Sequence, residues 1–255
     1  MLSLYRRVTV EAARRAVAAW PVALSLVVYA VVLVAALIAF APLGGIVGGL
    51  LVGLVMAACW SSYLELISQA VAGTKIRIRW GDFKRTFFAR FSDVISVMFA
   101  FWIISFLMTP LTKGPSGPAA AGVIGFAMAF FFNPVPELLY QGNSRSFNLL
   151  LDSGRFMFRF PVIWLLPNIV FAALALYASG RLAVQHPAEL LILFGNTFSS
   201  PAGVAEIFTG LPRWALPIAL VVLHYVMIFR GLLFRDLQAG TGNARLRAFQ
   251  AKLRG

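Results

Sequence analysis

Charged side chains are scarce in this sequence. They make up 12% of the 255 residues, whereas apolar side chains make up 60%. An average soluble domain has about 25% charged and roughly 45–50% apolar residues. So few charged groups leave little possibility of covering the surface of a water-soluble protein of this length. A large part of the surface is therefore expected to face lipid.

Cysteine and histidine are also scarce, which restricts the chemistry. Cys59 is the single cysteine, so the chain forms no intrachain disulfide and no cysteine-based metal site. His186 and His224 are the two histidines, too few to hold a metal on their own. The metalloprotease helix motif, the phosphate loop and the nucleophile elbow do not occur. We expect no metal, no cofactor and no catalytic residue, and a non-enzymatic role is favoured.

Six apolar segments are long enough to cross a bilayer, which requires about 20 mainly apolar residues. The first follows a basic arm, as a signal peptide does, but its apolar run exceeds the usual ~7–15 residues. We interpret it as a retained helix. The segments predict an all-α, polytopic membrane protein with six transmembrane helices. They cover residues 17–40, 46–70, 91–109, 119–140, 157–179 and 211–228.

The basic residues are unevenly distributed over the connecting segments. Four of the 22 Lys and Arg residues lie in the N-terminal arm, six between the second and third helices, three between the fourth and fifth, and six from Arg230 onward. Lys113, Arg181 and Arg213 fall on the other side. By the positive-inside rule both termini are cytoplasmic, in a bacterial inner membrane. The net charge of +13 is thus a topology signal, and no nucleic-acid partner is expected.

The chain divides into three similar units within one membrane domain, 1–255. Each unit has an amphipathic leader helix on the cytoplasmic side, followed by a hairpin of two spans. Glu65 in the first unit corresponds to Glu137 in the second. The units cover 1–72, 73–140 and 141–230, with an external insert at 180–212 in the third and a basic cytoplasmic tail at 231–255.

The leader helices mix arginine with aromatic residues, a pattern typical of helices that lie in the membrane interface. Each basic residue near an anionic surface contributes about 1 kcal/mol to binding. We expect these residues to contact anionic lipid headgroups, and a cytoplasmic protein is the alternative partner. The expected lipid contacts are Arg14, Arg15, Lys84, Arg85, Arg90, Arg155 and Arg159.

Three short motifs carry a resemblance to a known group of proteins. They are Trp80-Gly81-Asp82-Phe83-Lys84-Arg85, Asn133-Pro134-Val135-Pro136-Glu137, and Ser144-Arg145-Ser146-Phe147 through Gly154-Arg155-Phe156. Residues 76–173 resemble the six-pass bacterial membrane families that include the membrane domain attached to some glycerophosphodiester phosphodiesterases. The resemblance implies a fold of three helical hairpins. The 255 residues hold no soluble phosphodiesterase domain, so no catalytic residue is carried over.

Small residues recur every four positions along the second apolar segment. Such a ridge lets another helix approach closely in a membrane. The partner helix belongs either to the same chain or to another, so a homo-oligomer or a membrane-protein partner is possible. The predicted packing residues are Gly45, Gly49, Gly53 and Ala57.

Two prolines interrupt the end of the fourth apolar segment, just before Glu137. Pro134 and Pro136 lack the N–H groups that would bond the carbonyls of Phe130 and Phe132. At membrane depth such carbonyls need water, a neighbouring helix or a cation. A broken helix beside an acidic residue is typical of transporter sites, and it is also how an ordinary helix ends at the interface.

Polar residues near the cytoplasmic ends of the spans are the site candidates. Within a span they are costly unless they are paired. The alternative for Glu65 is an ion pair with a leader arginine, and for His224 it is an interhelical hydrogen bond in place of a proton relay. The hypothesis is a polar pocket near the cytoplasmic leaflet, lined by Ser61, Glu65, Ser68, Asn133, Glu137 and His224.

The leading functional interpretation is a non-enzymatic transport component or membrane-embedded subunit that contains this pocket. The alternative is a membrane scaffold or a lipid-organising subunit of a larger complex. An intramembrane lipid enzyme is the third class, and it has the least support because few catalytic groups converge.

Overall fold

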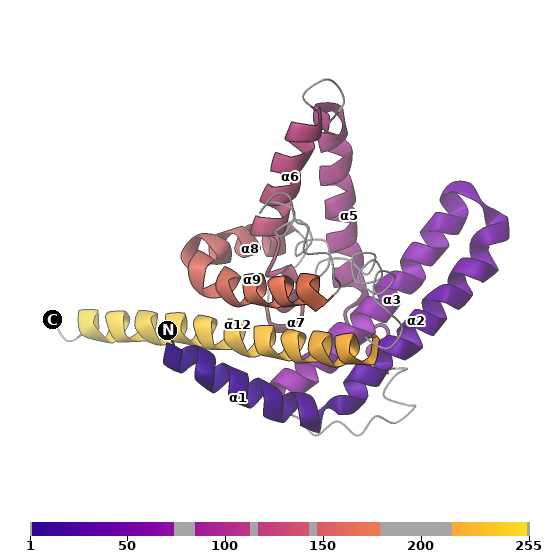
Figure 1. The fold of residues 1–255 in the computed structure, drawn as a ribbon. Helices are drawn as coiled ribbons and strands as arrows, with labels where there is room; N and C mark the ends of the chain where they lie inside the picture. Colours follow the sequence, from indigo (N-terminus) through magenta and orange to yellow (C-terminus); the bar gives the residue numbers. More distant parts are fainter. Residues whose placement is uncertain (1, 74–84, 113–116, 143–146, 179–215, 254–255) are drawn as a thin grey trace.

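The computed structural model describes residues 2–73, 85–112, 117–142, 147–178 and 216–253 (Figure 1). Every regular element in these ranges is a helix, which confirms the predicted all-α class. The external insert and Lys113 lie outside the described residues, as does the first part of the second leader, at 80–84. The helices are α1 (Leu2–Ala18), α2 (Trp20–Phe40), α3 (Gly45–Ala72), α5 (Phe91–Met108), α6 (Gly117–Phe131), α7 (Val135–Gln141), α8 (Phe147–Arg159), α9 (Pro161–Ala178) and α12 (Leu216–Leu253), with short 3-10 turns at Ala41–Leu43 and Thr109–Thr112.

Five described helices are long and apolar enough to cross a membrane, as expected for a multi-pass membrane protein. The predicted fifth span is different, because the amphipathic α8 ends at Arg159 and Pro161 starts a separate helix. The apolar part of α9 is shorter in the described residues, at Pro161–Phe171. The count of six spans and the three-hairpin layout therefore stay predictions. The five candidate spans are Trp20–Leu43, Gly45–Ala72, Phe91–Leu111, Gly122–Gln141 and Ile218–Gly240.

Helix α12 does not end at Ile228, where the sequence predicts the end of the last span. Helix α12 continues without a break to Leu253, so 38 residues form one helix of about 57 Å. The turn that follows Ile228 is stabilised by packing, because Leu232, Leu233 and Phe234 are buried against the rest of the chain. No proline follows Pro217 that could stop the helix.

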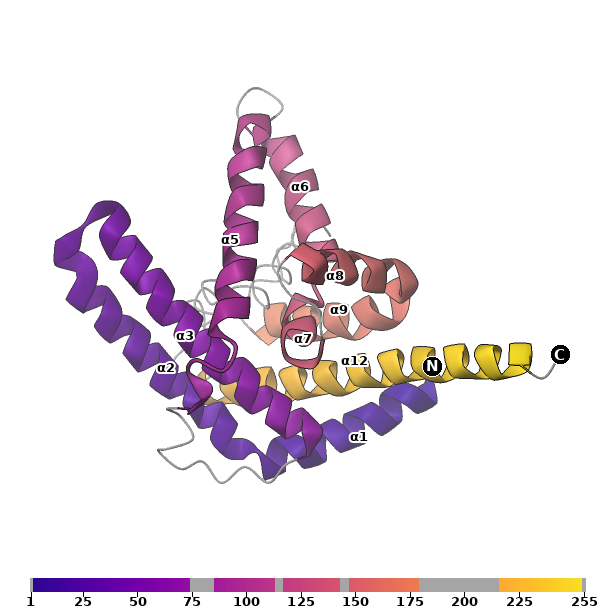
Figure 2. The same cartoon turned by 180° about the vertical axis from the view of Figure 1, so that it is seen from behind.

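Helix α1 lies antiparallel along α12, which brings the two ends of the chain to the same side of the molecule (Figures 1 and 2). Val8 and Ala12 are its buried residues, as expected for the apolar face of an amphipathic leader. Arg7 forms an ion pair with Asp236 of α12 (2.7 Å). The Tyr5 hydroxyl donates to the backbone carbonyl of Ile163, so α1 also holds α9 (2.9 Å).

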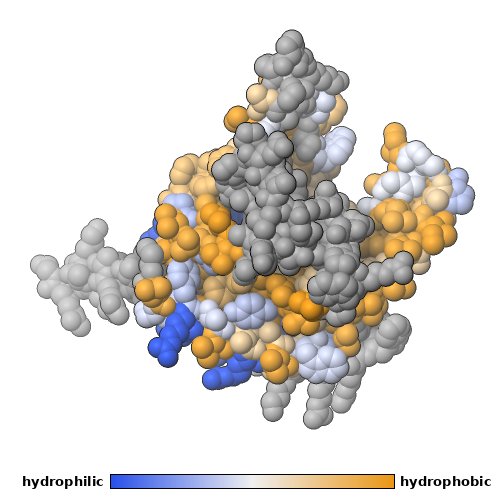
Figure 3. Space-filling view, in the orientation of Figure 1, coloured by the Kyte–Doolittle hydropathy of each residue, from blue (hydrophilic) through white to orange (hydrophobic). Residues whose placement is uncertain are grey.

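The α2–α3 and α5–α6 hairpins extend away from the packed region in different directions (Figures 1 and 2). Their outer ends expose apolar side chains such as Ile46 (90% exposed) and Phe106 (66%). In Figure 3 orange predominates on the α2–α3 hairpin, with white to pale blue residues near its outer end, whereas the deepest blue gathers over α1. This division suits lipid around the hairpins and water or headgroups at α1.

The small-residue ridge on α3 is covered only toward the C-terminal end of the helix. Ala57 is fully buried, but a Cβ added at Gly45, Gly49 or Gly53 would meet no other described atom within 4 Å. The glycine that faces a neighbour is Gly48, where a Cβ would lie 2.9 Å from the Phe40 carbonyl oxygen. Close packing on the three outer glycines therefore stays a prediction, and within the described residues no element of this chain provides it.

Candidate functional site

The predicted helix break is present between α6 and α7, and it exposes backbone carbonyls. The Val135 N–H bonds the Phe132 carbonyl in a turn (3.1 Å) and leaves the carbonyl of Phe131 without its usual helical donor. The Ser153 hydroxyl from α8 donates to that Phe131 oxygen at 2.6 Å. Neighbouring helices thus supply a partner at the break, one of the solutions open to a membrane helix.

Glu137 in the first turn of α7 forms a buried ion pair with Arg230 of α12. Arg230 Nε donates to Glu137 Oε1 (2.7 Å) and Arg230 Nη2 donates to Oε2 (2.9 Å). The same Nη2 donates to the backbone carbonyl of Asn133 at the break (2.6 Å). The side chains of Glu137 and Arg230 are 0% and 1% exposed. A bidentate pair of this kind is among the stronger charge-assisted contacts.

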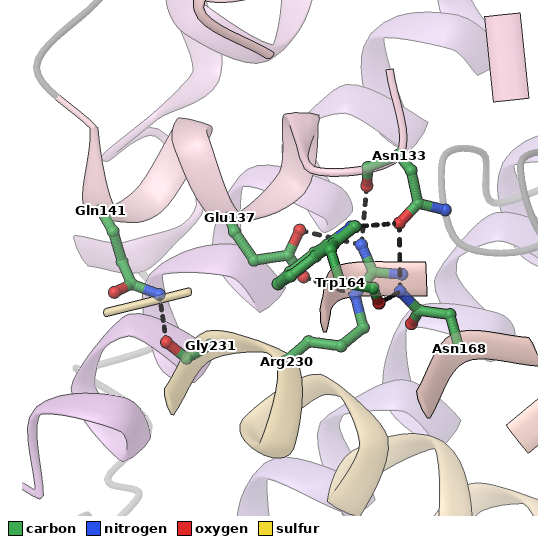
Figure 4. A network of polar contacts seen from close by, with 7 residues as sticks. All are labelled: Asn133, Glu137, Gln141, Trp164, Asn168, Arg230 and Gly231. Carbon is green, nitrogen blue, oxygen red and sulfur yellow. Dashed lines mark hydrogen bonds and ion pairs between the residues drawn. The ribbon is translucent and has the colours of Figure 1, made fainter. Parts of the chain in front are cut away.

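Helix α9 completes the surroundings of this pair (Figure 4). The Arg230 guanidinium lies over the Trp164 ring, with its Cζ 5.1 Å from the ring centroid. Trp164 Nε1 donates to Asn133 Oδ1 (2.7 Å). Asn168 Nδ2 donates to the Trp164 carbonyl (2.7 Å). We call Asn133, Glu137, Trp164, Asn168 and Arg230 the polar cluster. It joins α7, α9 and α12 at the centre of the molecule.

Glu65 pairs with a leader arginine, which confirms the alternative stated for it. Arg90, just before α5, directs its Nε at Glu65 Oε2 of α3 (2.9 Å) and its Nη1 at the Leu139 carbonyl of α7 (2.6 Å). Ser61 Oγ accepts from the Arg90 backbone N–H (2.9 Å). Arg90 therefore holds α3, α5 and α7 together.

The remaining predicted pocket residues are divided between different surroundings. Ser68 Oγ lies 3.4 Å from the Tyr140 carbonyl, so it too contacts α7. His224 is 2% exposed and lies beside the backbone of Ala16, with no hydrogen-bond partner of good geometry in the described chain. Arg230 follows His224 by six positions in α12, which places the two side chains about 120° apart around the helix. The structure brings Asn133 and Glu137 together on Arg230. Glu65 lies in a separate contact, because its partner Arg90 bonds the backbone of α7 and not Glu137. His224 lies against α1.

The predicted lipid-contact arginines fall into two groups. Arg14 and Arg155 have side chains that are 76% exposed, and Arg85 and Arg159 are also exposed. Arg15 and Arg90, with side chains 18% and 23% exposed, are engaged by the protein itself. Lys84 lies outside the described residues.

Two arginines converge on the C-terminal end of α3. Arg15 Nη1 and Arg235 Nη1 both donate to the Val71 carbonyl, the second at 3.1 Å. Cations are favourable there because the last carbonyls of a helix carry partial negative charge. Arg15 also bonds Glu11 (2.6 Å), and this hydrogen bond lowers the pKa of the Glu11 carboxyl.

Sequence reasoning missed Arg230, Trp164 and Asn168 as members of the polar cluster. Arg230 is included in the count of cytoplasmic basic residues, although apolar residues surround it on both sides, from Ile228 to Phe234. That isolation is the signal that could have separated it from the other arginines. Asn168 likewise stands alone within an apolar segment after Pro167.

In the described part of the chain, no group of three His, Cys, Asp or Glu side chains is placed to hold a metal ion. Comparison of the chain with known protein families, curated proteins and solved structures gave no match.

Proposed function

We propose that this protein is a non-enzymatic membrane scaffold that organises anionic lipid at the cytoplasmic face. The observation that supports it most directly is the division of its charges. Glu65 on α3 and Glu137 on α7 are both held by arginines. Exposed arginines remain on α1 and α8, at Arg14, Arg155 and Arg159. Exposed guanidinium groups on amphipathic helices suit phosphate headgroups.

The polar cluster supports this proposal because its charged groups are paired with one another. All four contacts of Arg230 described above involve Glu137, Asn133 or Trp164. A carboxylate that accepts two hydrogen bonds from a buried guanidinium is already neutralised, so it has little attraction left for a cation. The cluster then serves to fix α7 and α9 against α12, which positions the basic helices α1 and α8 on the same assembly.

Thermal stability in defined lipids tests the proposal. The full chain is prepared in dodecyl maltoside with added phosphatidylglycerol or phosphatidylcholine, at low and high salt. We expect phosphatidylglycerol to raise the unfolding temperature more than phosphatidylcholine, and 0.5 M NaCl to remove most of the difference, because salt screens exposed charges. Equal stabilisation by the two lipids at both salt concentrations would contradict the proposal.

A transport component is the second candidate, and one observation favours it. Asn168 Oδ1 in the polar cluster is buried and has no hydrogen-bond partner in the described residues. A buried polar atom of this kind requires an explanation, and a bound ion or solute is one. Uptake or efflux by proteoliposomes that is abolished by Asn168→Leu, with folding retained, would support transport over scaffolding.

A further inference from the structure

A groove runs between α1 and the middle of α12, and arginine is the most frequent residue in its lining. We call it the basic groove. Its volume is about 670 Å³, within the range of small-molecule sites. Four arginines face two carboxylates there, which leaves a net of two positive charges. The charged lining residues are Arg6, Arg7, Glu11, Arg14, Arg235 and Asp236.

The register of the two helices explains this concentration of charge. Residues 7, 11 and 14 of α1 are three or four positions apart, so they share one helical face. The antiparallel packing places that face along α12, where Arg7 meets Asp236. Arg6 lies beside Arg7 at the mouth of the groove and is exposed to solvent.

The acidic residues in the groove orient its arginines through ion pairs and leave the guanidinium groups accessible. Glu11 bonds Arg15 at 2.6 Å and lies 3.6 Å from Arg14. Asp236 is only 23% exposed, whereas its partner Arg7 is 70% exposed. The guanidinium groups of Arg7 and Arg14 thus remain accessible to a ligand. Several guanidinium groups in one concave site match the geometry of a phosphate, which accepts two parallel N–H donors from each arginine.

The lining also has apolar parts. Leu232 and Val8 at its floor are each 2% exposed, and Val10 at its edge is 55% exposed. A small water-soluble phosphate ester has no apolar part to contact these apolar side chains, whereas a glycerophospholipid has ester and acyl groups beside its phosphate. We propose that the basic groove binds the phosphate of an anionic lipid. This inference deepens the proposed function, on which it rests, by assigning the headgroup to one site.

Titration of the full chain in dodecyl maltoside tests this site. The probes are dihexanoyl phosphatidylglycerol, dihexanoyl phosphatidylcholine and glycerol 1-phosphate, and the readout is the Kd from microscale thermophoresis. We expect phosphatidylglycerol to bind more tightly than the other two. The double variant Arg6→Gln/Arg14→Gln is expected to weaken its binding about 25-fold, at about 1 kcal/mol for each arginine.

The matched control removes the same charge elsewhere. Arg155→Gln/Arg159→Gln on α8 is expected to weaken binding clearly less than Arg6→Gln/Arg14→Gln does, because these two arginines contribute only to the general attraction of anionic lipid and neither lines the basic groove. Glu11→Gln has the opposite sign and is expected to tighten binding about five-fold, because it removes a carboxylate from the lining. Cys59, which is buried (3% exposed), reports through its thiol reactivity whether each variant is folded.

Three outcomes would overturn the inference. Equal weakening by the α1 and α8 double variants would show general attraction of anionic lipid, which leaves the proposed function intact but removes the specific site. Binding of glycerol 1-phosphate as tight as that of phosphatidylglycerol would assign the groove to a soluble phosphate ester. If neither phosphatidylglycerol nor glycerol 1-phosphate binds the folded chain, the site is removed altogether.

Discussion

The buried pair of Glu137 and Arg230 allows the sharpest test of the polar cluster. Glu137→Gln keeps the volume of the side chain but removes its charge, so the Arg230 guanidinium stays buried without a counter-ion. Removing one partner of a buried ion pair costs about 3–5 kcal/mol. For a chain of this size each kcal/mol lowers Tm by roughly 2–4 °C, so we expect a decrease of roughly 6–20 °C.

The assay is thermal unfolding in dodecyl maltoside, followed by the reaction of Cys59 with a fluorogenic maleimide. Cys59 is the single cysteine of the chain and is 3% exposed, so it reacts when the core opens. Arg155→Gln is the control, because its partner Asp152 is a surface residue and such pairs contribute about 0–1 kcal/mol.

A double-mutant cycle separates the pair from its individual residues. In Glu137→Gln/Arg230→Met both charges are absent, so the double variant should lose clearly less stability than the sum of the two single variants. The reasoning is refuted if Glu137→Gln lowers Tm by no more than Arg155→Gln does. Additive losses would likewise show that the two charges do not stabilise one another.

Three further variants test contacts other than the Glu137–Arg230 pair. Gly231→Ala should lower the free energy of unfolding by about 1–3 kcal/mol, because the new Cβ would lie 2.4 Å from the Tyr140 hydroxyl. Its control is Gly240→Ala, whose Cβ meets open space and which should retain the wild-type Tm. Arg90→Gln should lower Tm by several degrees and the exposed Arg85→Gln should not, and equal Tm values would contradict the role given to Arg90. Gly49→Ile should leave the monomer as stable as the wild type and reduce self-association in light scattering, and an unchanged oligomeric state would exclude packing on that glycine.

The strongest sequence signals in this chain are local ones. Pro134 and Pro136 predict the helix break because a missing N–H acts within one turn, and α6 and α7 separate at that point. The pairing of Glu65 with Arg90 could be anticipated for a related reason, since a charge at the end of a span requires a partner from the adjacent basic leader.

Tertiary contacts explain what the sequence did not predict. Arg230 is 93 positions from Glu137, and no periodicity connects two residues so distant in the chain. Helix α12 packs against α1 beyond the predicted end of the last span, a contact between the two ends of the chain that no local pattern indicates. The spacing of Gly49 and Gly53 indicates a face suited to close packing. It does not indicate a partner helix, because the partner depends on residues outside α3.

The composition of the lipids that stay with the protein tests the central proposal most directly. Membranes that contain the chain are solubilised with a styrene–maleic acid polymer, and the lipids in the purified particles are compared with those of the whole membrane. The account predicts enrichment of anionic phospholipid, reduced in Arg6→Gln/Arg14→Gln by more than in Arg155→Gln/Arg159→Gln. Particles with the same lipid composition as the membrane would contradict it.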